Sequence, residues 1–134
     1  MSIEYSYQQE FEPSRLGELF RSVGWSSGDY PDALAVAMRG SHRVVSAWDG
    51  DILVGLMNAL ADGAMTAYFH YLLVRPSHQK QGIGSELVAR MLADYDGYAR
   101  KVLIAYDAQV GFYERCGFKR GEGATPVFIT YLTT

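Results

Sequence analysis

The stretch from Val74 to Val88, VRPSHQKQGIGSELV, decides the fold because it joins an apolar strand to an apolar helix. The strand side, residues 65–74, is rich in aromatic and branched residues. On the other side, apolar residues recur at helical spacing over 82–95 and predict an amphipathic helix. The connection is polar apart from one proline and leads to two glycines. The stretch therefore predicts a loop that delivers the chain to an open helix N-terminus.

The remaining elements are predicted from apolar periodicity, from turn residues and from helix stop signals. The predicted strands are 3–9, 44–48, 52–60, 65–74, 101–106 and 127–132, and the predicted helices are 14–23, 31–39, 82–95 and 110–115. Asp49 and Gly50 predict a tight hairpin, and residues 101–106 are expected to be a buried strand. This order predicts an α/β fold of the α+β type, a mixed sheet with helices on its faces, in a single domain over residues 1–134.

Composition excludes several classes of protein. The chain has 134 residues, 49% of them hydrophobic and 13% aromatic, which is enough for a packed core. Its net charge of −3 comes from basic and acidic residues that are mixed along the chain, so nucleic acid is not an expected partner. No apolar run approaches the roughly 20 residues of a membrane span. The single cysteine and the absence of an export signal predict a cytoplasmic protein.

Gly82 and Gly84 predict an anion site at the start of the helix over 82–95. A helix N-terminus carries unpaired N–H groups and the positive end of the helix dipole, and glycines let a bulky anion approach the backbone. No Ser, Thr, Asp or Asn stands where it would cap this helix, and Lys80 adds a positive charge. The pattern favours a pyrophosphate-binding site, although two glycines also serve simply to shape a tight loop.

Two other phosphate motifs do not fit these residues. A dinucleotide-binding fingerprint needs a third glycine, where Leu87 stands, and a turn that leaves the strand directly. A P-loop needs Gly-Lys followed by Ser or Thr, which the sequence lacks. Dinucleotide binding and nucleotide hydrolysis are therefore disfavoured.

Two blocks of residues resemble the GNAT superfamily of acetyl-CoA-dependent N-acetyltransferases. The first family block, Val-x-Pro, a short loop, Gln, two residues and Gly-x-Gly, is matched by Val74, Pro76, Gln79, Gly82, Ile83 and Gly84. The second, Phe-Tyr-Glu-x-x-Gly-Phe, is present as FYERCGF from Phe112 to Phe118. The resemblance implies about six or seven strands with a splayed central pair, and about four helices.

The resemblance also implies where acetyl-CoA binds as co-substrate. The backbone of Leu73 and Val74 would pair with the pantetheine amides in the manner of an added strand. Phe112 is expected to pack against the cofactor or the core. The residues expected to hold the pyrophosphate are Gln79 and Lys80 with the amides of Gln81, Gly82, Ile83, Gly84 and Ser85. No metal is expected, because the three histidines have no metal-ligand spacing.

By the same resemblance Tyr113 is the proton donor to the departing thiolate, since a phenol is protonated at neutral pH. The alternative is that Tyr113 is an aromatic packing residue without a role in the chemistry. Many relatives place a carboxylate on the strand before Val-x-Pro, but AYFHYLLV contains none. His70 is the titratable substitute for the general base. The alternatives are a strand histidine that is satisfied by a neighbour or faces solvent, and a relayed water with no dedicated base. A backbone N–H of Leu73 or Val74 would polarise the acetyl carbonyl.

The acceptor site is expected to include Trp25, Asp29, Tyr30 and Tyr71, which would form an aromatic and mildly acidic pocket for an amine. The same aromatics also suit a core or a homodimer interface. The predicted function is transfer of an acetyl group from acetyl-CoA to the primary amine of a small molecule. The alternatives are a protein or peptide amine as acceptor, or a module that binds acyl-CoA without catalysis.

Overall fold

The computed structural model describes residues 2–134, and its sheet has five strands in the order β1-β2-β3-β4-β5. All neighbouring strands are antiparallel except β4 and β5, which are parallel. The strands are β1 (Glu4–Ser6), β2 (Arg43–Asp49), β3 (Ile52–Ala61), β4 (Thr66–Val74) and β5 (Arg100–Leu103). The mixed α+β fold predicted from the sequence is therefore confirmed.

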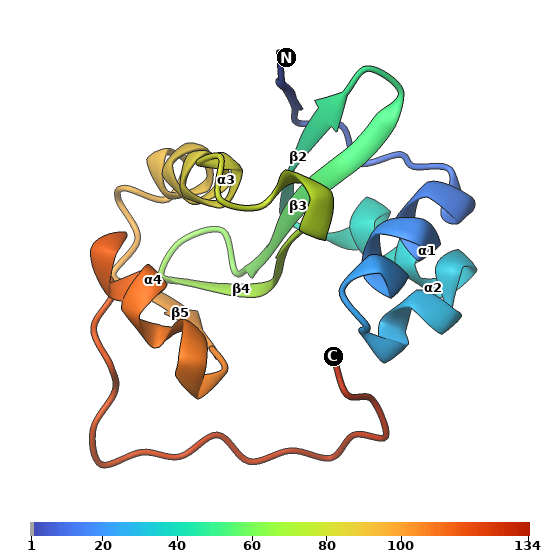
Figure 1. The fold of residues 1–134 in the computed structure, drawn as a ribbon. Helices are drawn as coiled ribbons and strands as arrows, with labels where there is room; N and C mark the ends of the chain where they lie inside the picture. Colours follow the sequence, from blue (N-terminus) through green and yellow to red (C-terminus); the bar gives the residue numbers. More distant parts are fainter. Residues whose placement is uncertain (1) are drawn as a thin grey trace.

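Helices cover both faces of the sheet (Figure 1). One core lies between the sheet and α3, and the other lies between the sheet and the pair α1 and α2. The helices are α1 (Pro13–Ser22), α2 (Pro31–Gly40), α3 (Ile83–Ala93) and α4 (Val110–Arg115), with short 3-10 turns η1 (Ser26–Asp29), η2 (Pro76–His78) and η3 (Asp107–Gln109). None of the helices described over residues 2–134 is long and apolar enough to cross a membrane.

A β-bulge in β4 changes which core its side chains enter. Asn58 of β3 lies opposite two residues of β4, His70 and Tyr71, where a regular ladder would place one. Phe69, before the bulge, belongs to the core under α3, whereas Tyr71 belongs to the core under α1 and α2. The bulge thus turns the second half of β4 relative to the first.

The buried side chain of Asn58 holds this bulge. Its Oδ1 accepts a hydrogen bond of 2.8 Å from the backbone N–H of Tyr71, and its Nδ2 donates to Ser41 Oγ at 3.1 Å. Ser41 Oγ in turn donates to the carbonyl of Ala37 in α2 at 2.8 Å. The bulge is therefore tied to the end of α2 through buried polar groups that satisfy one another.

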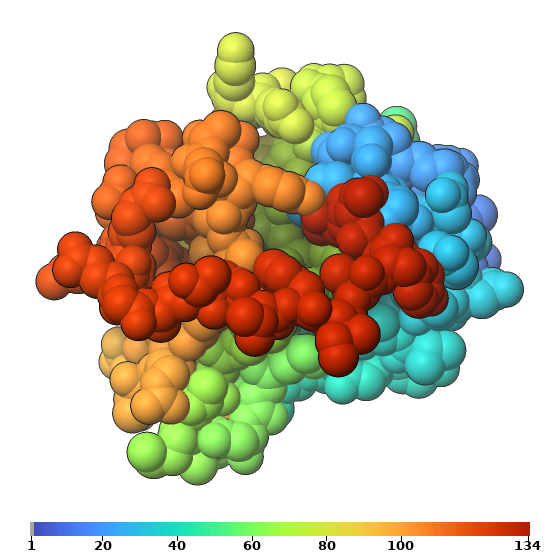
Figure 2. All heavy atoms as spheres, turned by 90° about the horizontal axis from the view of Figure 1, so that it is seen from below, coloured from blue at the N-terminus to red at the C-terminus, as the bar shows by residue number. Residues whose placement is uncertain are grey.

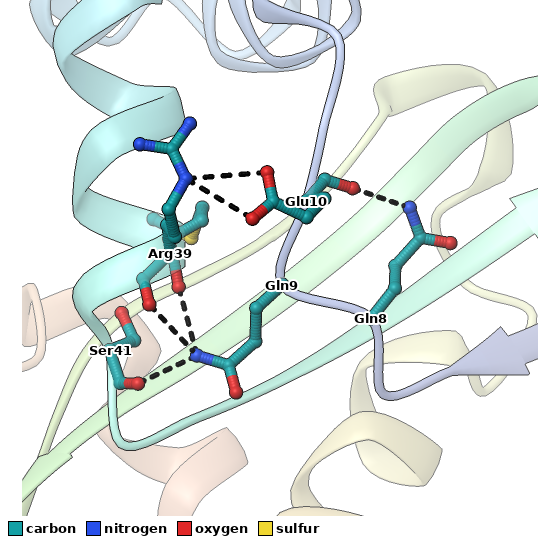
Figure 3. A network of polar contacts seen from close by, with 6 residues as sticks. Gln8, Gln9, Glu10, Arg39 and Ser41 are labelled. Atoms are coloured by element: carbon teal, nitrogen blue, oxygen red, sulfur yellow. Dashed lines mark hydrogen bonds and ion pairs between the residues drawn. The ribbon is translucent and has the colours of Figure 1, made fainter.

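The connection from β1 to α1 also stabilises the C-terminal end of α2 (Figure 3). Gln9 Nε2 donates to the carbonyls of Met38 at 3.2 Å and Ser41 at 2.7 Å, which caps the C-terminal end of α2. Beside it, Arg39 forms an ion pair with Glu10 at 3.2 Å. Because these residues leave the sheet to cap α2, β1 is three residues long and the predicted strand 3–9 is too long.

The predicted last strand, 127–132, is wrong. Residues 119–134 form no strand or helix, because an extended segment becomes a strand only when its backbone pairs with an edge, and this one has none beside it. The sheet therefore has five strands instead of six or seven. The prediction of a buried strand at 101–106 is also wrong, because β5 is a four-residue edge strand whose side chains are exposed or half-buried.

The other predicted elements are confirmed, with small shifts at their ends. The hairpin between β2 and β3 turns one residue later than predicted, since Asp49 pairs with Ile52 and the turn consists of Gly50 and Asp51. Gly50 has a φ of 58°, a left-handed conformation that glycine adopts without strain.

Candidate functional site

Strands β4 and β5 part where the bulge begins. Their pairing runs from Thr66 opposite Arg100 to Phe69 opposite Leu103 and ends there. A bulge bends the strand that carries it and increases its twist, which explains why the separation starts at His70. Leu73 and Val74 lie beyond the parting, so the predicted splayed pair is present and the β5 side of this part of β4 carries no strand.

The N-terminus of α3 has no cap. Its first helical hydrogen bond runs from the N–H of Glu86 to the carbonyl of Gly82 at 3.0 Å, and no side chain caps the residues before Glu86. The amides of Ile83, Gly84 and Ser85 thus precede the helical ladder, at the positive end of the helix dipole. This arrangement suits a bound anion.

Two left-handed residues shape the backbone just before this helix. Gly82 has a φ of 83° with open space where a Cβ would lie, so its conformation, and not crowding, calls for glycine. Lys80 has a φ of 62°, which is uncommon for a residue with a side chain and is typical of functional loops. Turns of alternating conformation gather N–H groups into a concave surface that binds anions.

Side chains brace the loop between β4 and α3. The ring of His78 bridges Asp49 Oδ2, at 2.9 Å from its Nε2, and Ser77 Oγ, at 2.7 Å from its Nδ1. The N–H of Arg75 donates to the carbonyl of Val54 at 2.7 Å. The loop is therefore fixed on β2 and β3. Sequence reasoning missed His78 and Asp49, because no local signal joins residues 29 positions apart.

The side chain of Gln79 is bonded to the end of β4. Its Nε2 donates to the carbonyl of Val74 at 2.9 Å. That carbonyl belongs to the stretch of backbone expected to pair with pantetheine. The structure therefore gives Gln79 a bond within the loop, and its predicted contact with the pyrophosphate stays a prediction.

Two glycines let three elements meet at the start of α3. A Cβ on Gly84 would lie 3.4 Å from Phe112 Cζ and 3.9 Å from Val74 Cγ2, which places α4 beside the end of β4. A Cβ on Gly55 of β3 would lie 3.3 Å from Ile83 Cγ2, closer than most side-chain contacts. Sequence reasoning missed Gly55, for which a glycine inside a predicted strand was the available signal.

Tyr113 lies in α4, next to this junction. Its ring packs against Phe112 and Phe118, with centroid distances of 5.1 and 6.0 Å. Burial raises the pKa of Tyr113 to about 12. Within residues 2–134 its hydroxyl has no hydrogen-bond partner, so it is protonated at neutral pH and available to donate.

His70 is the first residue of β4 beyond the paired segment. Its Nδ1 lies 2.7 Å from the hydroxyl of Tyr68, and its ring lies 4.3 Å from the ring of Tyr71. Although the side chain is partly exposed, desolvation lowers the pKa of His70 below its ordinary value of 6.5. The imidazole is therefore neutral at pH 7. In the tautomer whose Nδ1–H donates to the Tyr68 hydroxyl, Nε2 presents a lone pair.

Residues 40–120 match the family model described as "Acetyltransferase (GNAT) domain", which spans the parted strands, the open helix and Tyr113. The chain belongs to the GNAT acetyltransferase family. This confirms the family expected from the two sequence blocks and classes the chain as an acyltransferase. Acetyl-CoA is the acyl donor generally used by GNAT enzymes.

Relatives of the GNAT chain support the same placement. This chain is 38% identical over 69 residues to the chloroplastic GCN5-related N-acetyltransferase 3 of Arabidopsis thaliana. The match covers 49% of this chain and 29% of the plant protein. A GNAT-family acetyltransferase from Streptococcus pneumoniae has a TM-score of 0.83 and 28% identity over 97% of this chain and 99% of its own. A candidate acetyltransferase from Deinococcus radiodurans has a TM-score of 0.83 and 30% identity, with 96% and 88% covered.

The predicted acceptor residues of this GNAT chain fall into two groups. Trp25 and Tyr71 pack together at 6.2 Å in the core under α1 and α2, and the buried hydroxyl of Tyr71 is bonded to Ser27 Oγ at 2.8 Å. Asp29 and Tyr30 are exposed at the end of η1. The structure thus brings the first pair together, close to His70, and leaves the second pair at the surface.

The last residues of the chain bind η1. The carbonyl of Thr134 accepts hydrogen bonds from the N–H and Oγ of Ser27, at 2.8 and 2.6 Å, and the N–H of Thr133 donates to Ser26 Oγ at 2.8 Å. The hydroxyl of Tyr106 contacts Thr134 Oγ1. Figure 2 shows the tail, residues 119–134, crossing from the β5 and α4 region to the N-terminal helices, with a hollow beside it.

A separate surface hollow of about 510 Å³ lies at the start of α1, and the residues that line it include Phe11, Arg15 and Trp48. The guanidinium of Arg15 lies 5.8 Å above the Trp48 ring and donates to the carbonyl of Asp51, so this hollow already holds a cation of the chain itself. Residues 2–134 bring together no group of three or more His, Cys, Asp or Glu that would hold a metal ion.

Proposed function

We propose that the chain is an N-acetyltransferase that moves the acetyl group of acetyl-CoA to the primary amine of a small molecule. The observation that carries this proposal is the uncapped start of α3 beside the parting of β4 and β5, with the Tyr113 hydroxyl in the helix that packs there. An anion site, an open strand edge and a proton donor are the three features that an acyl-CoA thioester requires.

Binding would use mostly backbone groups. The diphosphate would accept hydrogen bonds from the amides between Gln81 and Ser85, with the Lys80 ammonium adding charge. The pantetheine amides would pair with Leu73 and Val74 as an added strand. Gln79 Nε2 donates a hydrogen bond to the Val74 carbonyl. This bond would break when a pantetheine amide donates to the same carbonyl.

Transfer would proceed by direct attack. The neutral amine nitrogen forms a bond to the acetyl carbonyl carbon, the carbon–sulfur bond breaks, and the thiolate takes a proton from the Tyr113 hydroxyl. The proton lost by the amine goes to His70 Nε2, directly or through a water molecule. A backbone N–H of Leu73 or Val74 would hydrogen-bond the developing oxyanion.

The acceptor would enter on the side of β4 that faces η1. Asp29 and Tyr30 are exposed on this side, where a carboxylate and an aromatic ring favour a cation, and Trp25 and Tyr71 pack in the core beside them. The tail crosses this face and leaves a hollow, which favours a small amine over a protein segment (Figure 2).

Thiol release from acetyl-CoA with a panel of amines tests this function. We expect turnover by the unaltered chain and about a 100-fold lower kcat for Tyr113→Phe, within the range for losing a general acid. The acetyl-CoA affinity should be unchanged, because the ring remains. Tyr7→Phe, an exposed tyrosine of the β1–α1 connection, is the matched control. A chain that gains thermal stability with acetyl-CoA but releases no thiol with any amine is a binding module, and the catalytic proposal fails.

A further inference from the structure

β4 places Tyr68, His70 and Tyr71 on the same face of the sheet. Side chains two positions apart in a strand share a face, which accounts for Tyr68 and His70. The bulge opposite Asn58 adds Tyr71, which would face α3 in a regular strand. The ring centroid of His70 lies 5.5 Å from that of Tyr68 and 4.3 Å from that of Tyr71. The imidazole is therefore in contact with two tyrosine rings at the point where β4 and β5 part.

Tyr68 is held more firmly than His70. Its backbone pairs with Leu60 of β3 and with Val102 of β5, so strands fix it on both sides. His70 lies beyond the last pair with β5 and has only β3 beside it. The hydroxyl of Tyr68 lies 2.7 Å from Nδ1 of His70, and within residues 2–134 it is the only hydrogen-bond partner of that ring. A fixed phenol thus sets the orientation of a less constrained imidazole.

The surroundings of His70 offer no charge to stabilise its protonated form. Desolvation lowers the pKa of His70, and no neighbouring charge among the described residues contributes to that shift. The titratable groups in contact with it are the phenols of Tyr68 and Tyr71. Desolvation raises the pKa of Tyr68, so this phenol stays neutral at pH 7. An imidazolium has two N–H donors, and its Nδ1–H therefore depends on the Tyr68 oxygen as acceptor.

We propose that Tyr68 is a positioning residue for acetyl transfer, whose hydroxyl oxygen accepts a hydrogen bond from Nδ1–H of His70 and so keeps Nε2 free for the proton of the amine. The inference rests on the proposed function, because it assigns Tyr68 a role through His70. When Nε2 takes the proton, Nδ1 keeps its own, and the bond to Tyr68 strengthens because its donor has become charged. Tyr68 neither gains nor loses a proton in this step.

The opposite direction of the hydrogen bond would prevent this chemistry. If the Tyr68 hydroxyl donated to Nδ1, the neutral imidazole would carry its proton on Nε2 and have no free lone pair for the amine. His78 differs from His70 in this respect, because its Nε2 lies 2.9 Å from the carboxylate of Asp49, which only accepts hydrogen bonds. The direction of one hydrogen bond therefore decides whether His70 serves as the base.

The ¹⁵N chemical shifts of the imidazole test this direction, because a nitrogen that carries a proton resonates apart from one that carries none. In the unaltered chain, labelled with ¹⁵N at histidine, we expect the neutral His70 to carry its proton on Nδ1 at mildly alkaline pH. His70→Gln assigns the two resonances by removing them. A proton on Nε2 in the unaltered chain would overturn the proposal. Because the spectrum requires no turnover, this result is independent of whether the chain transfers acetyl groups.

Kinetics of Tyr68→Phe test the role in catalysis. We expect a kcat about tenfold lower, the scale of one lost hydrogen bond to a charged group, with an unchanged affinity for acetyl-CoA. The acidic limb of the pH profile should move to lower pH, because the imidazolium loses the acceptor that stabilises it. Tyr95→Phe is the matched control, since it removes another Tyr–His hydrogen bond, of 2.7 Å to His42, just after α3. Its kcat and its acidic limb should equal those of the unaltered chain.

The outcomes separate this inference from the proposed function. A limb that moves to higher pH in Tyr68→Phe would show that Tyr68 donates to Nδ1, and the inference would fail. A kcat and a pH profile equal to those of the unaltered chain would also overturn it, while the proposed function would still stand. If the unaltered chain released no thiol with any amine, the proposed function itself would fail, and with it the catalytic role of Tyr68. Circular dichroism establishes that both variants are folded.

Discussion

The loop from Arg75 to Gln81 and the tail from residue 119 to 134 are both irregular, yet the structure holds them in different ways. The loop is tied to β2, β3 and β4 by hydrogen bonds through His78, Arg75 and Gln79. The tail is tied only at its end, through Ser26, Ser27 and Tyr106. Irregular backbone is thus fixed where neighbouring elements supply polar partners. We infer that the acyl-CoA side is preorganised and that the acceptor side is closed by a segment with few contacts.

The largest expected effect in this comparison comes from changing the conformation of the preorganised loop. Gly82→Ala places a Cβ on a left-handed residue, which costs about 1–2 kcal/mol. Because the same backbone turn presents the α3 amides, we expect acetyl-CoA affinity to fall about tenfold or more, the equivalent of about 1.4 kcal/mol. Isothermal titration calorimetry measures it.

Gly63→Ala is the matched control for that variant. Gly63 has a φ of 85°, also with open space around the missing Cβ, but it lies in the turn between β3 and β4. We expect a similar loss of stability with unchanged acetyl-CoA affinity. Equal losses of affinity in the two variants would show that the effect is general destabilisation, and the account of the loop would be wrong.

A smaller effect is expected from releasing the tail. Ser27→Ala removes one hydrogen bond to Thr134 and one to the Tyr71 hydroxyl. We expect the KM for the amine to change several-fold while the acetyl-CoA affinity stays constant, because the loop is held independently of η1. Steady-state kinetics with each substrate varied in turn measures this. A matched loss of acetyl-CoA affinity would contradict the separation of the two sides.

The smallest expected effect is on the pH profile of kcat at saturating amine. A base must be neutral to accept a proton, so a lowered pKa keeps His70 active until the pH falls below 6.5. The raised pKa of Tyr113, about 12, predicts no loss of its proton at mildly alkaline pH. We expect a single acidic limb below pH 6.5 that His70→Gln removes. A limb that persists in that variant would exclude His70 as the base.

Local signals predicted the preorganised half of the molecule well. Apolar periodicity and two glycines were enough for β4, the loop and the uncapped start of α3, because each is set by residues near one another in sequence. The bulge at His70 was not predictable, since it depends on the pairing with Asn58 and on the bond from Asn58 to Tyr71.

Contacts between residues far apart in the sequence also decide two features on the acceptor side that the sequence could not predict. The alternation over 127–132 is the same whether or not an edge lies beside it, so the pattern alone could not separate a strand from an unpaired tail. Similarly, aromatic composition does not separate a pocket from a core. Trp25 and Tyr71 pack under α1 and α2, while Tyr30 is exposed beside Tyr131.

The most direct test of the account compares the binding of acetyl-CoA with that of S-acetylpantetheine, which carries the same thioester and arm but lacks the diphosphate and the adenosine 3′-phosphate attached to it. The open amides of α3 are proposed to bind that diphosphate, so calorimetry should give tight binding for acetyl-CoA and at least ~100-fold weaker binding for the truncated compound, about 2.7 kcal/mol. Equal affinity for the two compounds, or no binding of acetyl-CoA by the folded chain, would contradict the account.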